Sequence, residues 1–274
     1  MKATIWGCRG SLATPGPETV RYGGDTSCVE VRTPTGRLIV LDAGTGIRQL
    51  GLALGGEAKD LDLLLTHMHL DHIEGLGFFA PLFDPEATIR VWGPRPLEGS
   101  LEELIATYLS PPYFPVPFER IPATISFTEL AAESFEIDDV TVTSTPVCHP
   151  GSTLGYRLSQ NGSSFAYIPD NEPALDRESG LAVAGDADVL FHDAQFTDEE
   201  YTTRVGWGHS AMSDFVTYLA AAAPKRAIMF HHDPTHADGQ LEGMLEGVRD
   251  TSSRDTSSNG TVELAHEGLE VELA

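Results

Sequence analysis

The chain has 274 residues, 41% of them hydrophobic, which is enough for a substantial core, and we predict one domain over residues 1–274. Its 41 acidic and 17 basic residues give a formal net charge of −24, which argues against long nucleic acid as a partner. No segment reaches the roughly twenty apolar residues of a membrane span, and the first residues lack the hydrophobic region of a signal peptide. We therefore expect no membrane partner and a cytoplasmic protein.

Short apolar or alternating runs bounded by Gly, Pro, Asp or Thr predict the strands of the first half. They lie at Ala3–Cys8, Cys28–Thr33, Arg37–Ala43, Leu61–Thr66 and Ile89–Trp92. Helical periodicity predicts helices over Gly46–Leu54 and Leu97–Leu109. Three cysteines without metal-type spacing, at positions 8, 28 and 148, are expected to be small buried hydrophobes rather than a disulfide framework.

The second half repeats this pattern of strands and helices. Strands are predicted at Ile125–Leu130, Glu133–Val147, Gly155–Gln160, Ser164–Pro169, Val189–Asp193, Ala227–His231 and Thr261–Leu273. Helices are predicted over Glu172–Ala184, Ala211–Ala222 and Gln240–Val248. The order predicts an α/β fold of two sheets with helices outside, and places function along one edge, where the strands end.

Two segments do not fit regular structure. Residues 94–118 end in the proline-rich and aromatic stretch Ser110–Phe118, which is interpreted as a lid, a subunit contact or a hydrophobic cover over the sheet. The polar stretch Asp250–Gly260 predicts a mobile surface loop before the final strand.

The strongest functional signal follows the apolar run Leu61–Leu65. Three imidazoles and a carboxylate fall within six residues there, at His67, His69, Asp71 and His72. This spacing lets the side chains point into one pocket, as a metal site requires. The alternative is a helix N-terminus, because Asp71 and the glutamate three residues later could form a capping box. Three histidines in so short a stretch favour the metal site.

Further candidates stand at the ends of later predicted strands. His149 precedes Pro150-Gly151, Asp170 ends the run from Phe165, and His232 follows the strand Ala227–Phe230. Each has a structural alternative, since Asp170 could cap a following helix and His149 could fill a turn.

Together these residues give the chain a resemblance to the metallo-β-lactamase fold superfamily, and within it to the branch of RNase Z and the cyclic-phosphate phosphodiesterases. The resemblance covers nearly the whole chain. It rests on the Gly-rich turn after the third strand (Asp42–Gly46), the HxHxDH motif of residues 67–72, and on His149, Asp170, Gly208-His209-Ser210 and His232. It implies a four-layer αββα sandwich and two divalent ions, with zinc first and manganese or iron as alternatives.

The resemblance also implies roles for individual residues. One zinc would be held by His67, His69 and His149, the other by Asp71, His72 and His232, with Asp170 bridging the two. His232 is preferred to His231 because the ligand of the family lies just past its strand end. Residues 231, 233 and 236 are expected in the surroundings of the site.

Two residues are assigned catalytic roles. Asp71 could orient the nucleophile or accept its proton, and His209 matches a histidine that donates a proton to the leaving oxygen in the phosphodiesterase branch. The structural alternative is that Ser210 caps a helix and His209 is incidental. Asp42 is interpreted as part of a tight turn beneath the ligands. His192-Asp193 is either a His–acid motif like that of RNase Z or a buried pair.

We predict a binuclear metal-dependent hydrolase, a phosphodiesterase in which a hydroxide bridging two metal ions attacks small phosphodiesters such as cyclic nucleotides. The alternatives are an RNase Z-like endoribonuclease, a hydrolase of lactones or other esters, and a metal-binding relative without catalysis. The RNA-gripping arm of RNase Z lies between the counterparts of His149 and Asp170, where this chain has only twenty residues. The resemblance also allows a homodimer in which the segment Pro111–Phe118 completes the partner's pocket.

Overall fold

The computed structural model describes residues 1–57, 59–254 and 260–273. The strands are Lys2–Gly7 (β1), Cys28–Arg32 (β2), Leu38–Leu41 (β3), Asp60–Leu64 (β4), Thr88–Pro94 (β5), Thr124–Leu130 (β6), Glu133–Ile137 (β7), Val140–Pro146 (β8), Leu154–Gln160 (β9), Ser163–Ile168 (β10), Val189–Asp193 (β11), Arg226–Phe230 (β12), Thr261–Leu264 (β13) and Glu270–Glu272 (β14). The α-helices are Gly46–Ala53 (α1), Leu101–Tyr108 (α2), Leu181–Ala184 (α3), Asp198–Tyr201 (α4), Met212–Ala222 (α5) and Asp238–Arg254 (α6). Short 3₁₀ helices occupy Leu70–His72 (η1), Leu76–Phe78 (η2), Ala80–Phe83 (η3) and Phe118–Arg120 (η4).

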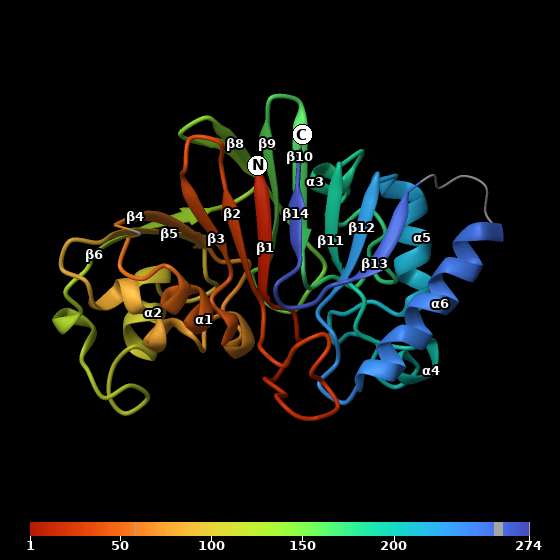
Figure 1. Cartoon of the computed structure of the whole chain (residues 1–274), viewed down its shortest axis with the longest axis horizontal. Helices are drawn as coiled ribbons and strands as arrows, with labels where there is room; N and C mark the ends of the chain where they lie inside the picture. The colour runs from red at the N-terminus through yellow and green to blue at the C-terminus, as the bar shows by residue number, and fades with distance from the viewer. Residues whose placement is uncertain (58, 255–259, 274) are drawn as a thin grey trace.

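Two seven-stranded sheets lie face to face with helices on their outer faces (Figure 1). The first has the strand order β14-β1-β2-β3-β4-β5-β6 and the second the order β13-β12-β11-β10-β9-β8-β7. Helices α1 and α2 cover the first sheet, and α5 and α6 cover the second. The predicted αββα sandwich is confirmed.

Three apolar cores hold these layers together. The central core lies between the sheets and includes the fully buried rings of Tyr156, Phe165 and Phe191. Strand β1 alternates buried and half-buried residues, as expected for a strand with one face on this core, whereas β3 is buried throughout. The other two cores fill the space between each sheet and its helices.

Parallel pairing decides where the loops meet. Strands β3 to β6 are parallel to one another, and so are β10 to β13. The carboxyl ends of such strands share one edge of their sheet, where ligands bind in open α/β sheets. The N-terminal loop of residues 8–27 (red in Figure 1) lies along the lower edge of the sandwich in this view.

Several predicted elements are corrected by the structure. The run Glu133–Val147 is not one strand but the hairpin β7-β8, which turns at Asp138 with a positive φ of 51°. The helix expected over Glu172–Ala184 forms only at Leu181–Ala184, and the residues before it are turns that contain Pro173. The terminal run splits into β13 and β14, which belong to different sheets.

Two more boundaries differ from the prediction. Helix α2 begins at Leu101 rather than Leu97, because Ser100 and Glu103 form a capping box. Helix α6 continues through Arg254, so the predicted surface loop is wrong for residues 250–254, and residues 255–259 lie outside the described residues.

The proline-rich segment covers the outer core of the first sheet. The ring of Phe114 makes edge-to-face and tilted contacts with Phe78 and Phe83, and Phe118 packs on Phe127. Tyr113 is exposed. These contacts favour the hydrophobic cover among the three interpretations of this segment. Among the described residues, no helix is long and apolar enough to cross a membrane.

Candidate metal centre

The HxHxDH residues leave the end of β4 and converge on Asp170, which follows β10. His67 lies in the extended segment after the strand, whereas Asp71 and His72 belong to η1. No side chain caps η1, so the capping-box alternative for Asp71 does not apply. The Nε2 atom of His72 lies 3.2 Å from Oδ1 of Asp170, and that of His67 lies 3.7 Å from Oδ2.

Three imidazoles form one half of the cluster, which we call the first half. They belong to His67, His69 and His149, and one ligand atom from each lies within 4.8 Å of the others. Nε2 of His149 is 3.0 Å from Nδ1 of His69 and 3.6 Å from Oδ2 of Asp170. His67 is buried, whereas His69 is exposed, so this half is open to solvent on one side.

The second half consists of Asp71, His72 and His231, all buried. Nε2 of His231 lies 3.1 Å from Oδ2 of Asp71 and 3.4 Å from Oδ1 of Asp170. Asp170 therefore directs Oδ2 to the first half and Oδ1 to the second, which is the geometry of a bridging carboxylate.

The expected position of His232 is corrected here. Its ring turns away from the cluster, and its Nε2 donates to the carbonyl of Ala265 at 2.9 Å. His231 occupies the place expected for His232 because its backbone adopts a φ of +58° directly after β12. His232 instead continues as extended chain beside the N-terminal loop and exchanges backbone hydrogen bonds with Cys8 and Gly10.

The orientation of three candidate ligands, His72, His149 and His231, is held by a contact to the second ring nitrogen. Nδ1 of His72 is 2.8 Å from Oδ2 of Asp42, Nδ1 of His149 donates to the carbonyl of Gly208 at 2.9 Å, and Nδ1 of His231 donates to Oε1 of Gln195 at 3.0 Å. Such contacts fix the tautomer and leave Nε2 free for a metal. The interpretation of Asp42 as support beneath the ligands agrees with this geometry, and Gln195 and Gly208 were not predicted in this role.

Metal ions fit this donor set. Nε2 of His67, Nε2 of His72 and Oδ1 of Asp170 are buried and have no hydrogen-bond partner. Buried polar atoms without partners are rare, and bound cations would satisfy three that converge on one space. Imidazole and carboxylate donors suit zinc and other divalent transition metals.

The electrostatics of the two halves differ. Burial lowers the pKa of His149 to about 4 and holds the pKa of His67 well below its usual range, so both are neutral donors near neutral pH. Burial also opposes the charged form of His231, but Asp170 and Asp71 outweigh it and raise its pKa to about 9. The carboxylates of Asp170 and Asp71 thus stabilise positive charge in the second half.

His209 lies beside both halves, in the segment before α5. Its Nδ1 donates to Oδ2 of Asp193 at 2.7 Å, and its ring stacks on His231 with centroids 4.8 Å apart. Oδ1 of Asp193 accepts from the backbone N–H of Gln195 and of Ser210, so the carboxylate is rigidly held. Ser210 does not cap α5, whose N-cap is Ala211, and this removes the structural alternative for His209.

A buried carboxylate positions the loop before His209. Oε1 of Glu172 accepts from the N–H of Gly206 and Oε2 from the N–H of Gly208, both at 2.7 Å, and Tyr201 donates to Oε1. Gly208 has a φ of +90°, and a Cβ there would lie 2.3 Å from Nδ1 of His149. Only glycine allows this carbonyl to reach the ligand. A glycine on each side of Trp207 is a weak sequence signal for this loop conformation. No sequence signal indicated the role of Glu172.

The pair His192-Asp193 divides its roles. Asp193 supports His209, while His192 is fully buried against Tyr218, with ring centroids 4.3 Å apart. Nδ1 of His192 donates to the carbonyl of Asp193, and its Nε2 accepts from the amide of Asn171 at 3.2 Å. His192 is therefore a structural histidine rather than a ligand.

Comparison with known proteins agrees with this geometry. The model of the Beta-lactamase superfamily domain matches residues 37–232. The chain belongs to the β-lactamase superfamily. Its fold is that of the metallo-β-lactamase members, and it is a metal-dependent hydrolase whose fold implies divalent ions.

Within this superfamily, the chain is similar to ribonuclease Z. It is 23% identical to the ribonuclease Z of Gemmatimonas aurantiaca over an alignment of 293 residues, which covers 88% of each protein. It is 24% identical to that of Haloarcula marismortui, over 98% of this chain and 96% of the relative.

Solved structures of similar fold cover the whole chain. A diphosphatase of the PhnP family superposes with a TM-score of 0.69 at 20% identity, covering 98% of that protein. The short form of human tRNase Z gives a TM-score of 0.70 at 17% identity and is covered completely. These likenesses confirm the fold. Taken with the family match and the similarity to ribonuclease Z, they agree with the predicted branch of the superfamily.

Proposed function

We propose that this superfamily member is a phosphodiesterase, acting as one catalytic domain over residues 1–274 on small phosphodiesters such as cyclic nucleotides. The observation that carries the proposal is the contact of His209 with Asp193 beside the two-halved cluster. A histidine oriented by a carboxylate can deliver a proton to a leaving alkoxide, which phosphodiester cleavage requires. The sequence-based expectation of a cytoplasmic location stays a prediction.

The proposed ligand set is His67, His69 and His149 in the first half, Asp71, His72 and His231 in the second, and Asp170 between them. Two divalent ions, with zinc as the preferred candidate, would activate water and neutralise charge on the phosphate when bound there. Asp71 accepts the backbone N–H of Ser11 through Oδ2, which holds it at the edge where the nucleophile must lie. His209 protonates the leaving oxygen through Nε2, because its Nδ1 is engaged by Asp193.

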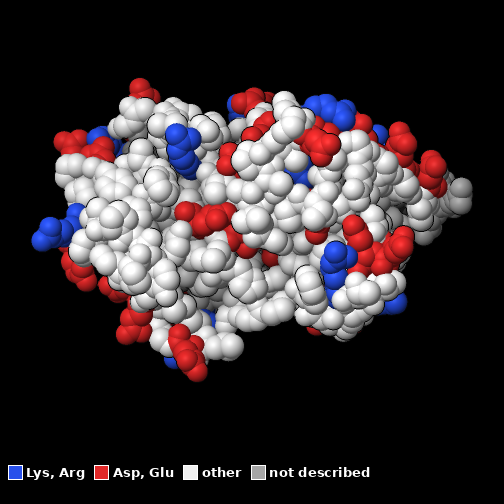
Figure 2. Space-filling model, turned by 90° about the horizontal axis from the view of Figure 1, so that it is seen from below, with Lys and Arg blue, Asp and Glu red and all other residues white. Residues whose placement is uncertain are grey.

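The small substrate is supported by the compactness of the chain between His149 and Asp170. Strands β9 and β10 are joined by a tight turn through Asn161 and Gly162, both with positive φ, and carry no inserted arm. Figure 2 shows the lower face of Figure 1, where Lys and Arg side chains do not gather into a patch. With a net charge of −24, a folded RNA has little electrostatic attraction to this face.

A ribonuclease Z-like activity is the second candidate. It is favoured by the similarity to proteins of that name over 88–98% of this chain. An esterase or lactonase, or a relative that binds metal without catalysis, would share the same fold and ligands. A homodimer in which one copy completes the other's pocket is compatible with either candidate.

Metal analysis and one substrate panel separate these candidates. The purified chain, loaded with zinc or manganese, is assayed with bis(p-nitrophenyl) phosphate, cyclic nucleotides, a lactone and a precursor tRNA. We expect two metal equivalents and the highest kcat/KM for a cyclic nucleotide. Preferred cleavage of the tRNA would establish the second candidate, and preferred hydrolysis of the lactone would overturn both.

A further inference from the structure

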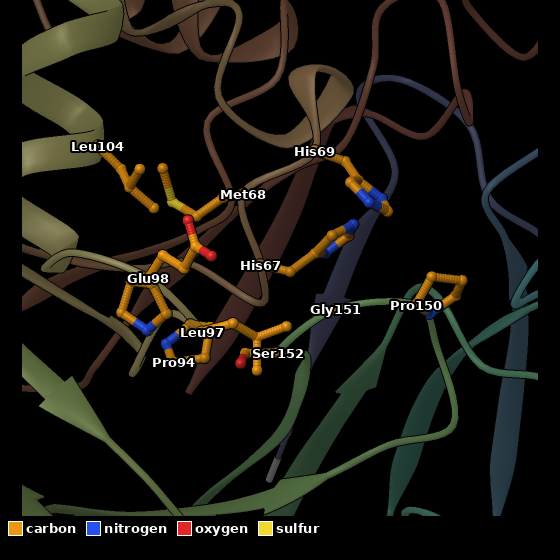
Figure 3. A pocket seen from close by; sticks show the side chains of 11 residues that line it. His67, Met68, His69, Pro94, Leu97, Glu98, Leu104, Pro150, Gly151 and Ser152 are labelled. Atoms are coloured by element: carbon orange, nitrogen blue, oxygen red, sulfur yellow. The ribbon is translucent and has the colours of Figure 1, made fainter.

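A cavity of about 210 Å³ opens beside the first half of the cluster (Figure 3). The residues that line it come from the HxHxDH segment, the loop after β5, helix α2 and the loop after His149, namely His67, Met68, His69, Pro94, Pro96, Leu97, Glu98, Leu104, Pro150, Gly151 and Ser152. Because two candidate ligands form part of its wall, a group joined to a phosphate at the cluster reaches this cavity directly.

The walls of the cavity suit a flat apolar group. Met68, Leu97 and Leu104 supply aliphatic surface, and the proline rings add rigid faces on which an aromatic ring can stack. The cavity is smaller than the roughly 300–1,000 Å³ that encloses a drug-sized ligand. It therefore accommodates one substituent of the substrate rather than the whole molecule.

Glu98 is the charged side chain in this lining, which includes neither Lys nor Arg among the residues that the structure describes. In Figure 3, Glu98 lies on one side of the cavity with Met68 and Leu104, and the imidazoles of His67 and His69 lie on the other. No ion pair is formed by Glu98 in the described part of the chain. An ionised carboxylate only accepts hydrogen bonds, and it repels a second phosphate.

We propose that this cavity binds the nucleobase of a small phosphodiester and that Glu98 selects a base with adjacent N–H donors, as guanine has. This inference rests on the proposed phosphodiesterase function and names the substrate class of that site. The two N–H groups on one edge of guanine match the two oxygens of the carboxylate. Uracil presents one N–H between two carbonyls, which the carboxylate repels.

The test compares Glu98→Gln with Glu102→Gln in the metal-loaded protein. Glu102 lies four residues away, is exposed, and does not line the cavity, so its substitution changes the same net charge outside the pocket. Steady-state kinetics are measured with cyclic GMP, cyclic UMP and bis(p-nitrophenyl) phosphate. Binding of guanosine monophosphate is measured by calorimetry, which needs no turnover.

We expect Glu98→Gln to lower kcat/KM for cyclic GMP about tenfold or more, mainly through KM, because a hydrogen bond to a charged acceptor is lost. Cyclic UMP and bis(p-nitrophenyl) phosphate should change less than twofold, and Glu102→Gln should resemble the parent. Weaker binding of guanosine monophosphate to Glu98→Gln should accompany the effect.

One result overturns the inference, and another separates it from the proposed function. Equal kinetics and equal nucleotide binding for Glu98→Gln and Glu102→Gln would overturn the role of Glu98. If the parent cleaves no phosphodiester but binds guanosine monophosphate through Glu98, the proposed function fails and the nucleobase site stands.

Discussion

The two sheets contribute to the metal centre in different ways. The residues that the first sheet supplies come from one stretch, His67 to His72, which leaves a single strand. The second sheet supplies His149, Asp170 and His231 from three separate strand ends, each supported by further residues. A contiguous motif is specified locally, whereas the second sheet must fold completely before its ligands meet. The contributions of the second sheet therefore depend on residues that touch no metal.

The largest expected effect comes from Asp170, the residue that both halves share. Asp170→Asn removes the charge that faces five imidazoles, so we expect loss of both metal equivalents and a fall in activity of about a thousandfold or more, some 4 kcal/mol. Metal content by mass spectrometry and hydrolysis of the best substrate measure this. Asp188→Asn, just before β11 and away from the cluster, is the control, and retention of two metals by Asp170→Asn would contradict the shared role.

The adjacent histidines after β12 sharpen the comparison. His231→Ala should lose about one metal equivalent and lower activity about a hundredfold or more, because it removes a proposed ligand from the second half. His232→Ala should keep both metals but unfold more easily by about 1–3 kcal/mol, since it leaves the carbonyl of Ala265 without its buried donor. Metal analysis and urea unfolding distinguish them, and the reverse pattern would restore His232 as the ligand.

Two glycines of one loop test whether residues outside the ligand set affect metal affinity by holding the imidazoles in place. Gly206 and Gly208 both have positive φ, but a Cβ at Gly206 meets open space, whereas one at Gly208 collides with His149. Gly208→Ala should weaken metal binding about tenfold or more through displacement of that imidazole. Gly206→Ala carries only the backbone strain, about 1 kcal/mol of stability. Equal metal affinities in a chelator competition would show that the close approach is unimportant.

The smallest effect concerns His192, a histidine of the second sheet that binds no metal. Burial lowers its pKa in the folded protein to about 4, below about 6.5 in the unfolded chain. Its contribution to stability is complete above pH 6.5 and is lost as the pH falls towards 4, by up to about 1.4 kcal/mol per pH unit. Urea unfolding of the metal-free protein at pH 7 and pH 5.5 should show a steeper decline than in His192→Asn, and equal slopes would refute this.

The success of the sequence-based prediction differs between the residues of the first sheet and those of the second. The αββα layers and the convergence of the first-sheet candidate ligands were predictable because strand periodicity and the HxHxDH spacing are local properties. Asp170 and His149 were found through strand ends, and the predicted neighbourhood of His209 agrees with the structure. The choice between His231 and His232 was wrong, because one positive φ decides which ring faces the cluster.

Other errors also came from tertiary context. The apolar residues of segment 172–180 have helical spacing, yet the chain there forms turns. The carboxylate of Glu172 instead accepts hydrogen bonds from Gly206, Gly208 and Tyr201. The last predicted strand is divided between the sheets, which its alternating pattern does not reveal. Supporting residues such as Gln195 have no distinctive spacing, since their role exists only after the two sheets have met.

The carboxylate of Asp170 has a consequence for how such a centre can diverge. One oxygen faces each half, so any exchange of this side chain alters the preferences of both halves together. The imidazoles, in contrast, each belong chiefly to one half. Adaptation to a different metal is therefore more accessible through the histidines, where one position can be retuned while its neighbour keeps its original coordination.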